Sequence, residues 1–404
     1  MEIGPILRAM LRNKLGVVLV ALQIAFTMTV IINAVFIINE RSRLMARPSG
    51  LDEANLFYLS SIGFGDGFNE EISISDDLAL LRQTPGIVNA TVTNAIPVSG
   101  SGSGTAVRTT DDESQPQSFA AIYRVDEQAI DTMGLELIAG ENFTASDILI
   151  RERNSATAAS KTVISLAFAK VLYPDEEPGE ILGRTIYQGA NRPQQIVGVV
   201  SQLQAPWMGN SNVEQSMMVP ENVSDGASIY LIRTEPGERD RLMVAAEELL
   251  VASNSNRIIR GLESLEQTRI DAYRIDSAMS NILWVLIITL VFITCAGIVG
   301  LAVFGINRRR KQIGTRRALG ATQFQILRHF MIENFFITGI GVTLGAVLTI
   351  AFSILLTTNF NMPTMAWYYT PLGMIALILV GQISVLGPSA GAARIEPAIA
   401  TRSI

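Results

Sequence analysis

The chain has 404 residues, of which 49% are hydrophobic and only 17% are charged. This composition is too apolar for an ordinary soluble domain. The sequence contains one cysteine, Cys295, so no disulfide bond within the chain stabilises the fold. It also contains one histidine, His329, which cannot form a multi-histidine metal site or a Ser-His-Asp triad with distant residues.

Three long stretches of the chain carry no charge, at residues 15–39, 277–307 and 334–393. A membrane-crossing helix needs roughly 20 apolar residues. The first two stretches therefore hold one span each, and the third holds two, separated by a polar break that contains Asn359 and Pro363. The sequence predicts spans at residues 15–39, 282–306, 332–357 and 370–388. The first is too long for the apolar region of a signal peptide and has no clear cleavage site. Residues 1–14 predict a cytoplasmic amphipathic segment, or else a frayed tail.

The charges divide sharply between two parts of the chain. Outside residues 39–281 there are 12 basic and 3 acidic side chains, whereas residues 39–281 carry 19 basic and 34 acidic ones. Basic flanks stay in the cytoplasm, and a large acidic segment is translocated. We therefore expect both termini in the cytoplasm, a cytoplasmic tail at residues 389–404, and residues 40–281 on the opposite side of the membrane.

Residues 40–260 show the mixed pattern of an α/β domain with at least two lobes. Short alternating runs, such as residues 56–60 and 195–200, predict strands, and residues 76–83 and 239–253 predict helices, the first with Ser75 as its N-cap. The glycine-rich run at residues 99–104 lacks the lysine of a phosphate-binding loop. The fold class expected is a membrane protein of four transmembrane α-helices, with a large α/β periplasmic domain inserted between the first and the second.

An apolar repeat of seven residues precedes the second span: Leu265, Ala272, Met279 and Leu286. The repeat does not change where the charges stop, so residues 261–281 predict one stiff stalk helix that continues into the membrane. The alternative is a plain juxtamembrane helix without a mechanical role.

The most charged short stretch, residues 307–331, lies between the second and third spans. It carries seven basic residues and no acid, which is more charge than orientation requires. Gly320 is placed as the C-cap of a helix at residues 311–319, and Thr322 with Gln325 has the spacing of a capping box for the next helix. Phe324, Leu327, Phe330 and Met331 are expected to give that helix one apolar face, which leads into the third span. The alternative to a partner-binding loop is anchoring of anionic lipid.

These residues resemble the loop signature of MacB/FtsX-like ABC transporter permeases of the mechanotransmission type. The resemblance is carried by Lys311, Gln312, Ile313, Gly314, Arg316, Arg317, Ala318, Leu319, Gly320 and Ala321. Residues 125–143 and 164–200 resemble the MacB-type periplasmic core domain, and Pro388, Arg394 and Pro397 resemble the C-terminal ending of the family.

The resemblance implies a non-catalytic permease of the bacterial inner membrane, with residues 40–281 in the periplasm. Such a permease works as a dimer or heterodimer with separate cytoplasmic ATPase subunits. ATP and Mg would be bound by the ATPase and not by this chain, and the ten residues above would form the coupling helix and its turn. A periplasmic adaptor and an outer-membrane channel are the further partners implied for an efflux pump. No Walker A motif occurs in the sequence, and Gln312 stands where the family usually has Glu, which suggests pairing with a different permease.

Two other functions remain open at this point. The same ATPase-coupled permease would also suit lipoprotein extraction or activation of an envelope enzyme, and a ligand-sensing membrane receptor would also use a basic loop for signalling. Acidic runs such as residues 111–113 are interpreted as solvated surface, and Trp207 with Met208 as either a partner contact or a buried corner. Nothing in the sequence indicates a nucleic-acid partner.

Overall fold

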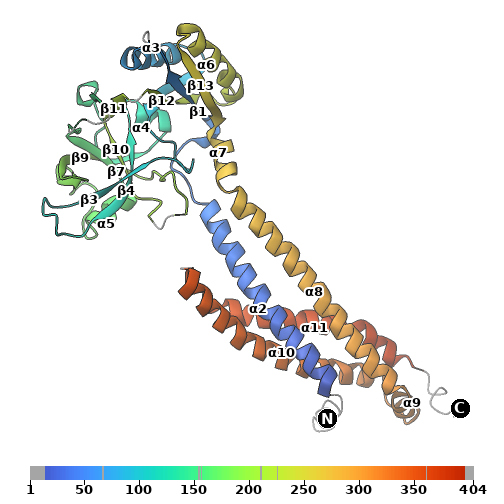
Figure 1. Cartoon of the computed structure of the whole chain (residues 1–404). Helices are drawn as coiled ribbons and strands as arrows, with labels where there is room; N and C mark the ends of the chain where they lie inside the picture. The colour runs from blue at the N-terminus through green and yellow to red at the C-terminus, as the bar shows by residue number, and fades with distance from the viewer. Residues whose placement is uncertain are drawn as a thin grey trace. The chain divides into compact units, whose positions relative to one another are not determined.

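The computed structural model describes residues 14–65, 68–152, 155, 157–209, 212–224, 226–360 and 362–395. The chain divides into two compact units (Figure 1): a helical unit, Met1–Met45 with Asp276–Ile404, and an inserted domain, Ala46–Ile275. The predicted amphipathic segment 1–14, apart from Lys14, and Pro397 lie outside the described residues.

Four described helices are long and apolar enough to cross a membrane, as the sequence predicts. They are α2 (Lys14–Met45), α8 (Arg274–Arg308), α10 (Gln323–Phe360) and α11 (Tyr369–Ala393). Since about 20 residues cross the hydrocarbon layer, the 38 residues of α10 and the 35 of α8 extend beyond it. The short helix α9 (Arg310–Ala318) joins α8 to α10.

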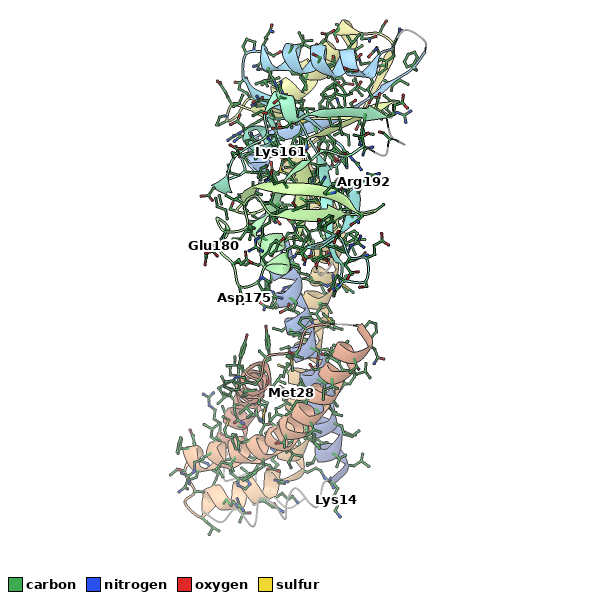
Figure 2. All side chains as sticks on the ribbon, turned by 90° about the vertical axis from the view of Figure 1, so that its left-hand side faces the viewer. Lys14, Met28, Lys161, Asp175, Glu180 and Arg192 are labelled. Carbon is green, nitrogen blue, oxygen red and sulfur yellow. The ribbon has the colours of Figure 1, made fainter. Side chains whose placement is uncertain are left out.

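Small residues let α10 pack closely against α2. A Cβ atom added at Gly345 would lie 2.9 Å from the side chain of Met28, and one added at Gly341 would lie 2.8 Å from Ile24. Met28 is fully buried among the helices (Figure 2). Gly341 and Gly345 therefore allow the close approach of α10 and α2. Ala296 and Gly300 of α8 have the same spacing but are exposed, and no described atom lies within 4 Å of a Cβ placed at Gly300.

Hydrogen bonds between side chains and backbone connect the spans at several depths. The hydroxyls of Thr27 on α2 and Thr294 on α8 lie 2.8 Å apart, and Asn334 on α10 donates to the carbonyl of Gly381 on α11 at 2.9 Å. At the opposite end of α2 from Lys14, Arg41 forms an ion pair with Asp276 of α8. Polar pairs of this kind fix the rotation of helices that are apolar on all sides.

The inserted domain contains two main sheets. A seven-stranded sheet has the order β5-β9-β7-β10-β4-β3-β8, and β8 also pairs with β9, which closes the sheet on itself. Its strands are β3 (Ser103–Arg108), β4 (Ser118–Arg124), β5 (Leu137–Gly140), β7 (Lys161–Ser165), β8 (Thr185–Gln188), β9 (Arg192–Val200) and β10 (Ser216–Val219). A two-stranded parallel sheet, β6 (Leu149–Glu152) with β11 (Glu221–Ser224), accompanies it.

The second main sheet is four-stranded and antiparallel, with the order β13-β1-β12-β2. Its strands are β1 (Leu56–Gly63), β2 (Ile87–Thr93), β12 (Ala227–Thr234) and β13 (Arg257–Ser264). Helices α3 (Glu70–Arg82) and α6 (Arg239–Ser253) cover one face and share a core with Phe57, Tyr230 and Ile232. A different core, which includes Leu56, Leu231 and Tyr123, joins this lobe to the seven-stranded one.

The remaining elements of the inserted domain are short. They are the 3-10 helices η1 (Glu53–Asn55) and η2 (Ala145–Asp147) and the α-helices α4 (Ala129–Met133), α5 (Leu166–Leu172) and α7 (Leu265–Ala272). The mixed α/β pattern and the helix at residues 239–253 are confirmed. The predicted start of the helix at 76–83 is wrong: α3 begins at Glu70, and Asn69 is its N-cap because its side chain accepts from the backbone of Ile72.

The prediction of one uninterrupted stalk helix over residues 261–281 is wrong. Residues 261–264 belong to β13, so the first helix, α7, begins at Leu265. α7 ends at Ala272, and Tyr273 leaves the helical conformation (φ −96°, ψ 11°) before α8 begins at Arg274. The Tyr273 side chain is buried, and Arg269 lies over its ring. Leu265 is buried in the inserted domain, whereas Met279 is exposed on α8, so the seven-residue repeat does not mark one continuous face.

The α2–α10 packing predicts opposite effects for two glycines of the same helix. Gly345→Ala forces a methyl group against Met28 and Ala25, and such overpacking costs about 1–3 kcal/mol. Gly339→Ala meets no described atom within 4 Å and is expected to be neutral or to stabilise by up to about 1 kcal/mol through helix propensity. Thermal unfolding of both variants in one detergent measures the difference. An equal effect at the two positions would contradict the packing.

Candidate coupling site

Residues 307–331 run from the end of α8 through α9 to the first turns of α10 and form a helix-turn-helix, here called the elbow. Helix α9 carries Arg310, Lys311, Arg316 and Arg317, and the first turns of α10 add Arg328. The start of α2, helix α9 and the end of α11 lie at one end of the helical unit (Figure 1). The elbow thus gathers basic side chains at one end of the spans.

The turn of the elbow is set by Gly320. Its φ of +95° lies in the left-handed region, which side chains with a Cβ rarely adopt. The backbone N–H of Gly320 donates to the carbonyl oxygen of Arg317 at 3.1 Å, and the backbone N–H of Ala321 donates to the carbonyl oxygen of Arg316 at 3.0 Å. This pair of hydrogen bonds is the Schellman motif that ends many helices. The predicted C-cap at Gly320 is confirmed, with α9 one residue earlier at both ends than predicted.

The next helix begins with the predicted capping box. The backbone N–H of Gln325 donates to the Thr322 hydroxyl at 3.2 Å, and the N–H of Thr322 donates to the Gln325 side chain at 3.0 Å. Two backbone donors that a helix start leaves unpaired are thereby satisfied. Because both helix ends at the turn are closed by local hydrogen bonds, the elbow holds its shape without a partner.

One face of α9 is buried against the ends of the spans. Ile313 and Gly314 are buried, and Ile313 belongs to a core cluster with Ile306, Ile326, Phe330, Ala392 and Ala393. These residues come from α8, α10 and α11. Ile313 and Gly314, predicted among the coupling residues, therefore face inward and fix α9 to the spans, and Arg317 is half-buried and donates to the carbonyl of Ala321 at 3.1 Å.

An ion pair, which the sequence analysis did not anticipate, ties the elbow to α10. Arg309 is the residue before α9. Its two terminal nitrogens, Nη1 and Nη2, donate to the two carboxylate oxygens of Glu333, at 2.9 and 3.1 Å. The pair is largely shielded from solvent. A signal did exist in the sequence: Glu333 is the one acid between Asp276 and Glu396, and an isolated acid at a membrane span usually has a basic partner.

The outer face of the elbow combines basic and large apolar side chains. Leu319 is 84% exposed and Phe324 is 66% exposed, and Lys311, Gln312 and Arg316 are exposed beside them. The prediction that Phe324 shares one apolar face with Phe330 is wrong, because Phe324 is exposed whereas Phe330 is buried together with Ile326. Exposed apolar anchors inside a charged rim are typical of a protein-binding surface. We call Lys311, Gln312, Arg316, Leu319 and Phe324 the elbow surface.

The fold defines the chain as a multi-span membrane protein with a large domain inserted after its first span and a basic helix-turn-helix between its second and third. Comparison with protein families identifies this class further. Residues 15–251 match the MacB-like periplasmic core domain, and residues 284–397 match the FtsX-like permease C-terminal domain. The chain therefore belongs to the MacB/FtsX-like family of ABC transporter permeases, an inner-membrane family.

Curated relatives agree with this assignment. The chain is 25% identical over 413 residues to "Macrolide export ATP-binding/permease protein MacB" of Mannheimia succiniciproducens, covering 96% of this chain and 59% of the relative. It is 24% identical over 300 residues to "Uncharacterized ABC transporter permease YknZ" of Bacillus subtilis, covering 71% of each. The chain thus spans a little over half the length of the MacB relative.

Among solved structures, the periplasmic region of MacB from Actinobacillus actinomycetemcomitans aligns with 17% identity and a TM-score of 0.34. The alignment covers 56% of this chain and 97% of that structure. A score at this level adds nothing to the family assignment, which stands on the two domain matches.

The Arg309–Glu333 contact predicts non-additive stability. Arg309→Gln and Glu333→Gln each leave one charge without its partner, so each is expected to destabilise the helical unit, whereas the double variant removes both charges. We expect a coupling energy on the order of 1 kcal/mol in a double-mutant cycle measured by thermal unfolding. Arg310→Gln, at an exposed neighbour, is the control and is expected to change stability little. Strict additivity would contradict the pairing.

Proposed function

We propose that this chain couples ATP hydrolysis by a cytoplasmic ABC-type ATPase to movement of its inserted domain. The observation that supports the proposal is the elbow surface: Leu319 and Phe324 are largely exposed on a rigid, basic helix-turn-helix. ATP and Mg belong to the ATPase, which binds them on its own chain. This permease supplies no catalytic group.

The elbow is positioned to pass a displacement to the spans. Its inward face is fixed by Ile313 to residues of α8, α10 and α11, and Arg309 is fixed by its ion pair to α10. A partner that moves α9 therefore moves the ends of three spans together. The inserted domain is joined to the spans through the chain at α2 and α8, and these two helices are held together by Arg41 and Asp276. Force carried by the spans reaches the domain through these two connections.

Export, with a periplasmic adaptor and an outer-membrane channel, is the output we propose, since relatives are named for macrolide export. Gln312 is exposed on the elbow surface, so its replacement of the usual acid acts at the partner contact and not in the core. This placement supports a heterodimer in which a related permease presents a different residue to the ATPase pair.

Removing the two apolar anchors is expected to release the ATPase. Apolar anchors that become buried in an interface contribute about 2 kcal/mol or more each. The double variant Leu319→Ser with Phe324→Ser should therefore reduce the recovery of an ABC-type ATPase more than about tenfold. Recovery is measured by co-purification in detergent, with the ATPase identified by its mass. Charge reversal by Lys311→Glu with Arg316→Glu should have the same effect, because these basic side chains are exposed on the same helix-turn-helix as the apolar anchors.

The matched control is Arg43→Glu, an exposed arginine at the other end of α2. It reverses one charge, where the elbow variant reverses two, and it lies outside the elbow, so ATPase recovery should remain at the level of the unchanged protein. Wild-type recovery with both elbow variants would overturn the proposal, provided that they reach the membrane in normal amount.

The proposed topology makes a separate prediction. In a Cys295→Ser background, which removes the one cysteine, Val244→Cys on α6 should react with a membrane-impermeant maleimide in spheroplasts. Arg316→Cys on the elbow should react only after the membrane is broken. Both sites are exposed, so accessibility to solvent does not distinguish them. The reverse labelling pattern would place the elbow outside.

A further inference from the structure

The three consecutive arginines at the end of α8 do not share one role. Arg309, the middle one, is held inward by its ion pair with Glu333 of α10. Arg308 and Arg310, on either side of it, are exposed. Neither belongs to the elbow surface, so the proposed ATPase contact leaves these two side chains without a function.

The Arg308 side chain lies against an aromatic ring on the outside of the spans. Its guanidinium carbon is 5.5 Å from the ring centroid of Phe304, a residue that is 53% exposed. Phe304 is one turn further into α8, a helix apolar enough to cross a membrane. An arginine whose stem covers apolar surface at the end of a span keeps its charged group in the headgroup layer.

Contacts between the spans place Arg308 at the membrane boundary. The hydroxyls of Thr27 on α2 and Thr294 on α8 lie 2.8 Å apart. The two helices run in opposite directions, and each residue rises about 1.5 Å along its helix. Counting the same number of residues from this contact leads to Lys14 on α2 and to Asn307 on α8. The uncharged stretches of both spans therefore end at one level, and Arg308 is the first charge of α8 beyond it.

The basic residues at this end have too few acids to balance them. Glu333 is the one acid in residues 277–395, and both of its carboxylate oxygens accept from its arginine partner. Outside residues 39–281 the sequence has 12 basic and 3 acidic side chains, so most of the basic ones have no acid to pair with, however the acids are shared. Within the part of the chain that the structure describes, neither Arg308 nor Arg310 forms an ion pair.

A phospholipid suits this face of α8 better than a second copy of the chain. In a two-fold pair of spans packed through the face, Arg308 of one copy would approach Arg308 of the other, and like charges repel strongly where water is scarce. An anionic phospholipid has the opposite charge at this depth, and its alkyl chains match Phe304. Further along α8 the face is open, because Gly300 is exposed and no described atom lies within 4 Å of a Cβ placed there.

We propose that the end of α8 binds an anionic phospholipid, with its phosphate at Arg308 and Arg310 and an acyl chain along Phe304 and Gly300. The assignment to the cytoplasmic leaflet rests on the proposed topology. The binding itself does not, because it is measured on the permease without its ATPase. Loss of ATPase recovery and loss of lipid binding are therefore separate results.

The test measures which lipid lies beside Gly300 when the full chain is in lipid nanodiscs. In the Cys295→Ser background, Gly300→Cys carries a bimane fluorophore, which is quenched by lipids that have a nitroxide on one chain. The probes are phosphatidylglycerol, which is anionic, and phosphatidylcholine, which has no net charge, with the same chains. The quenching constant for phosphatidylglycerol should be at least about tenfold the larger, since each basic side chain near an anionic lipid contributes about fivefold.

The matched label position is Ile340→Cys on α10, which is also exposed. Gly341 of α10 and Gly297 of α8 face adjacent residues of α2, so Ile340 lies within about one turn of the depth of Gly300. A label at this position should be quenched equally by the two lipids.

Substitutions in pairs locate the charge. Arg308→Gln with Arg310→Gln should lower the preference for phosphatidylglycerol at least about tenfold, to that of the control label. Lys311→Gln with Arg316→Gln removes two positive charges from the elbow surface instead and should leave the preference unchanged. Arg308→Lys with Arg310→Lys keeps both charges and should retain most of it. Unchanged thermal unfolding shows that each variant is folded.

Three results would overturn the proposal. Equal preference at the two label positions would attribute it to the bilayer as a whole. An unchanged preference after Arg308→Gln with Arg310→Gln would remove the site. Loss of the preference in excess inorganic phosphate, compared with chloride at the same ionic strength, would make this a site for a soluble anion. A preference that persists in phosphate supports the lipid.

Discussion

The ion pair between Arg309 and Glu333 is the contact on which the elbow depends. A helix of nine residues such as α9 is too short to be stable alone, so its position has to come from tertiary contacts. The ion pair holds the residue before α9, and Ile313 holds its inward face against α8, α10 and α11. With these contacts the basic outer face is a fixed surface. Without them the same residues would be a charged linker.

This arrangement separates two tasks within one short stretch of sequence. Ile313 and Gly314 are buried and maintain the position of α9, whereas Leu319 and Phe324 are exposed and free to contact another protein. Family resemblance alone assigns all of these residues to one motif. The burial pattern shows that the motif contains a packing half and a surface half, so substitutions in the two halves act by different physical routes, loss of elbow structure and loss of a contact.

The spans, the α/β domain and the elbow turn could be predicted because each rests on a local signal: uncharged length, residue alternation, or a glycine and a capping box at fixed spacing. The closed sheet and the Arg309–Glu333 pair could not, since they join residues far apart in the chain. The stalk shows a different limit. A seven-residue repeat across Ala272 predicts one helix, but burial of the Tyr273 side chain and the contacts of Arg269 with Glu53 and the Arg47 carbonyl interrupt it.

The shared core of the two lobes limits how far they can separate. Leu56 and Leu231 from the four-stranded lobe pack in the same buried cluster as Tyr123 and Met218 from the other, so opening the lobes widely would expose this core to water at a large cost. Under the proposed coupling, a displacement that reaches one lobe through α2 or α8 would therefore be passed to the other lobe through this core.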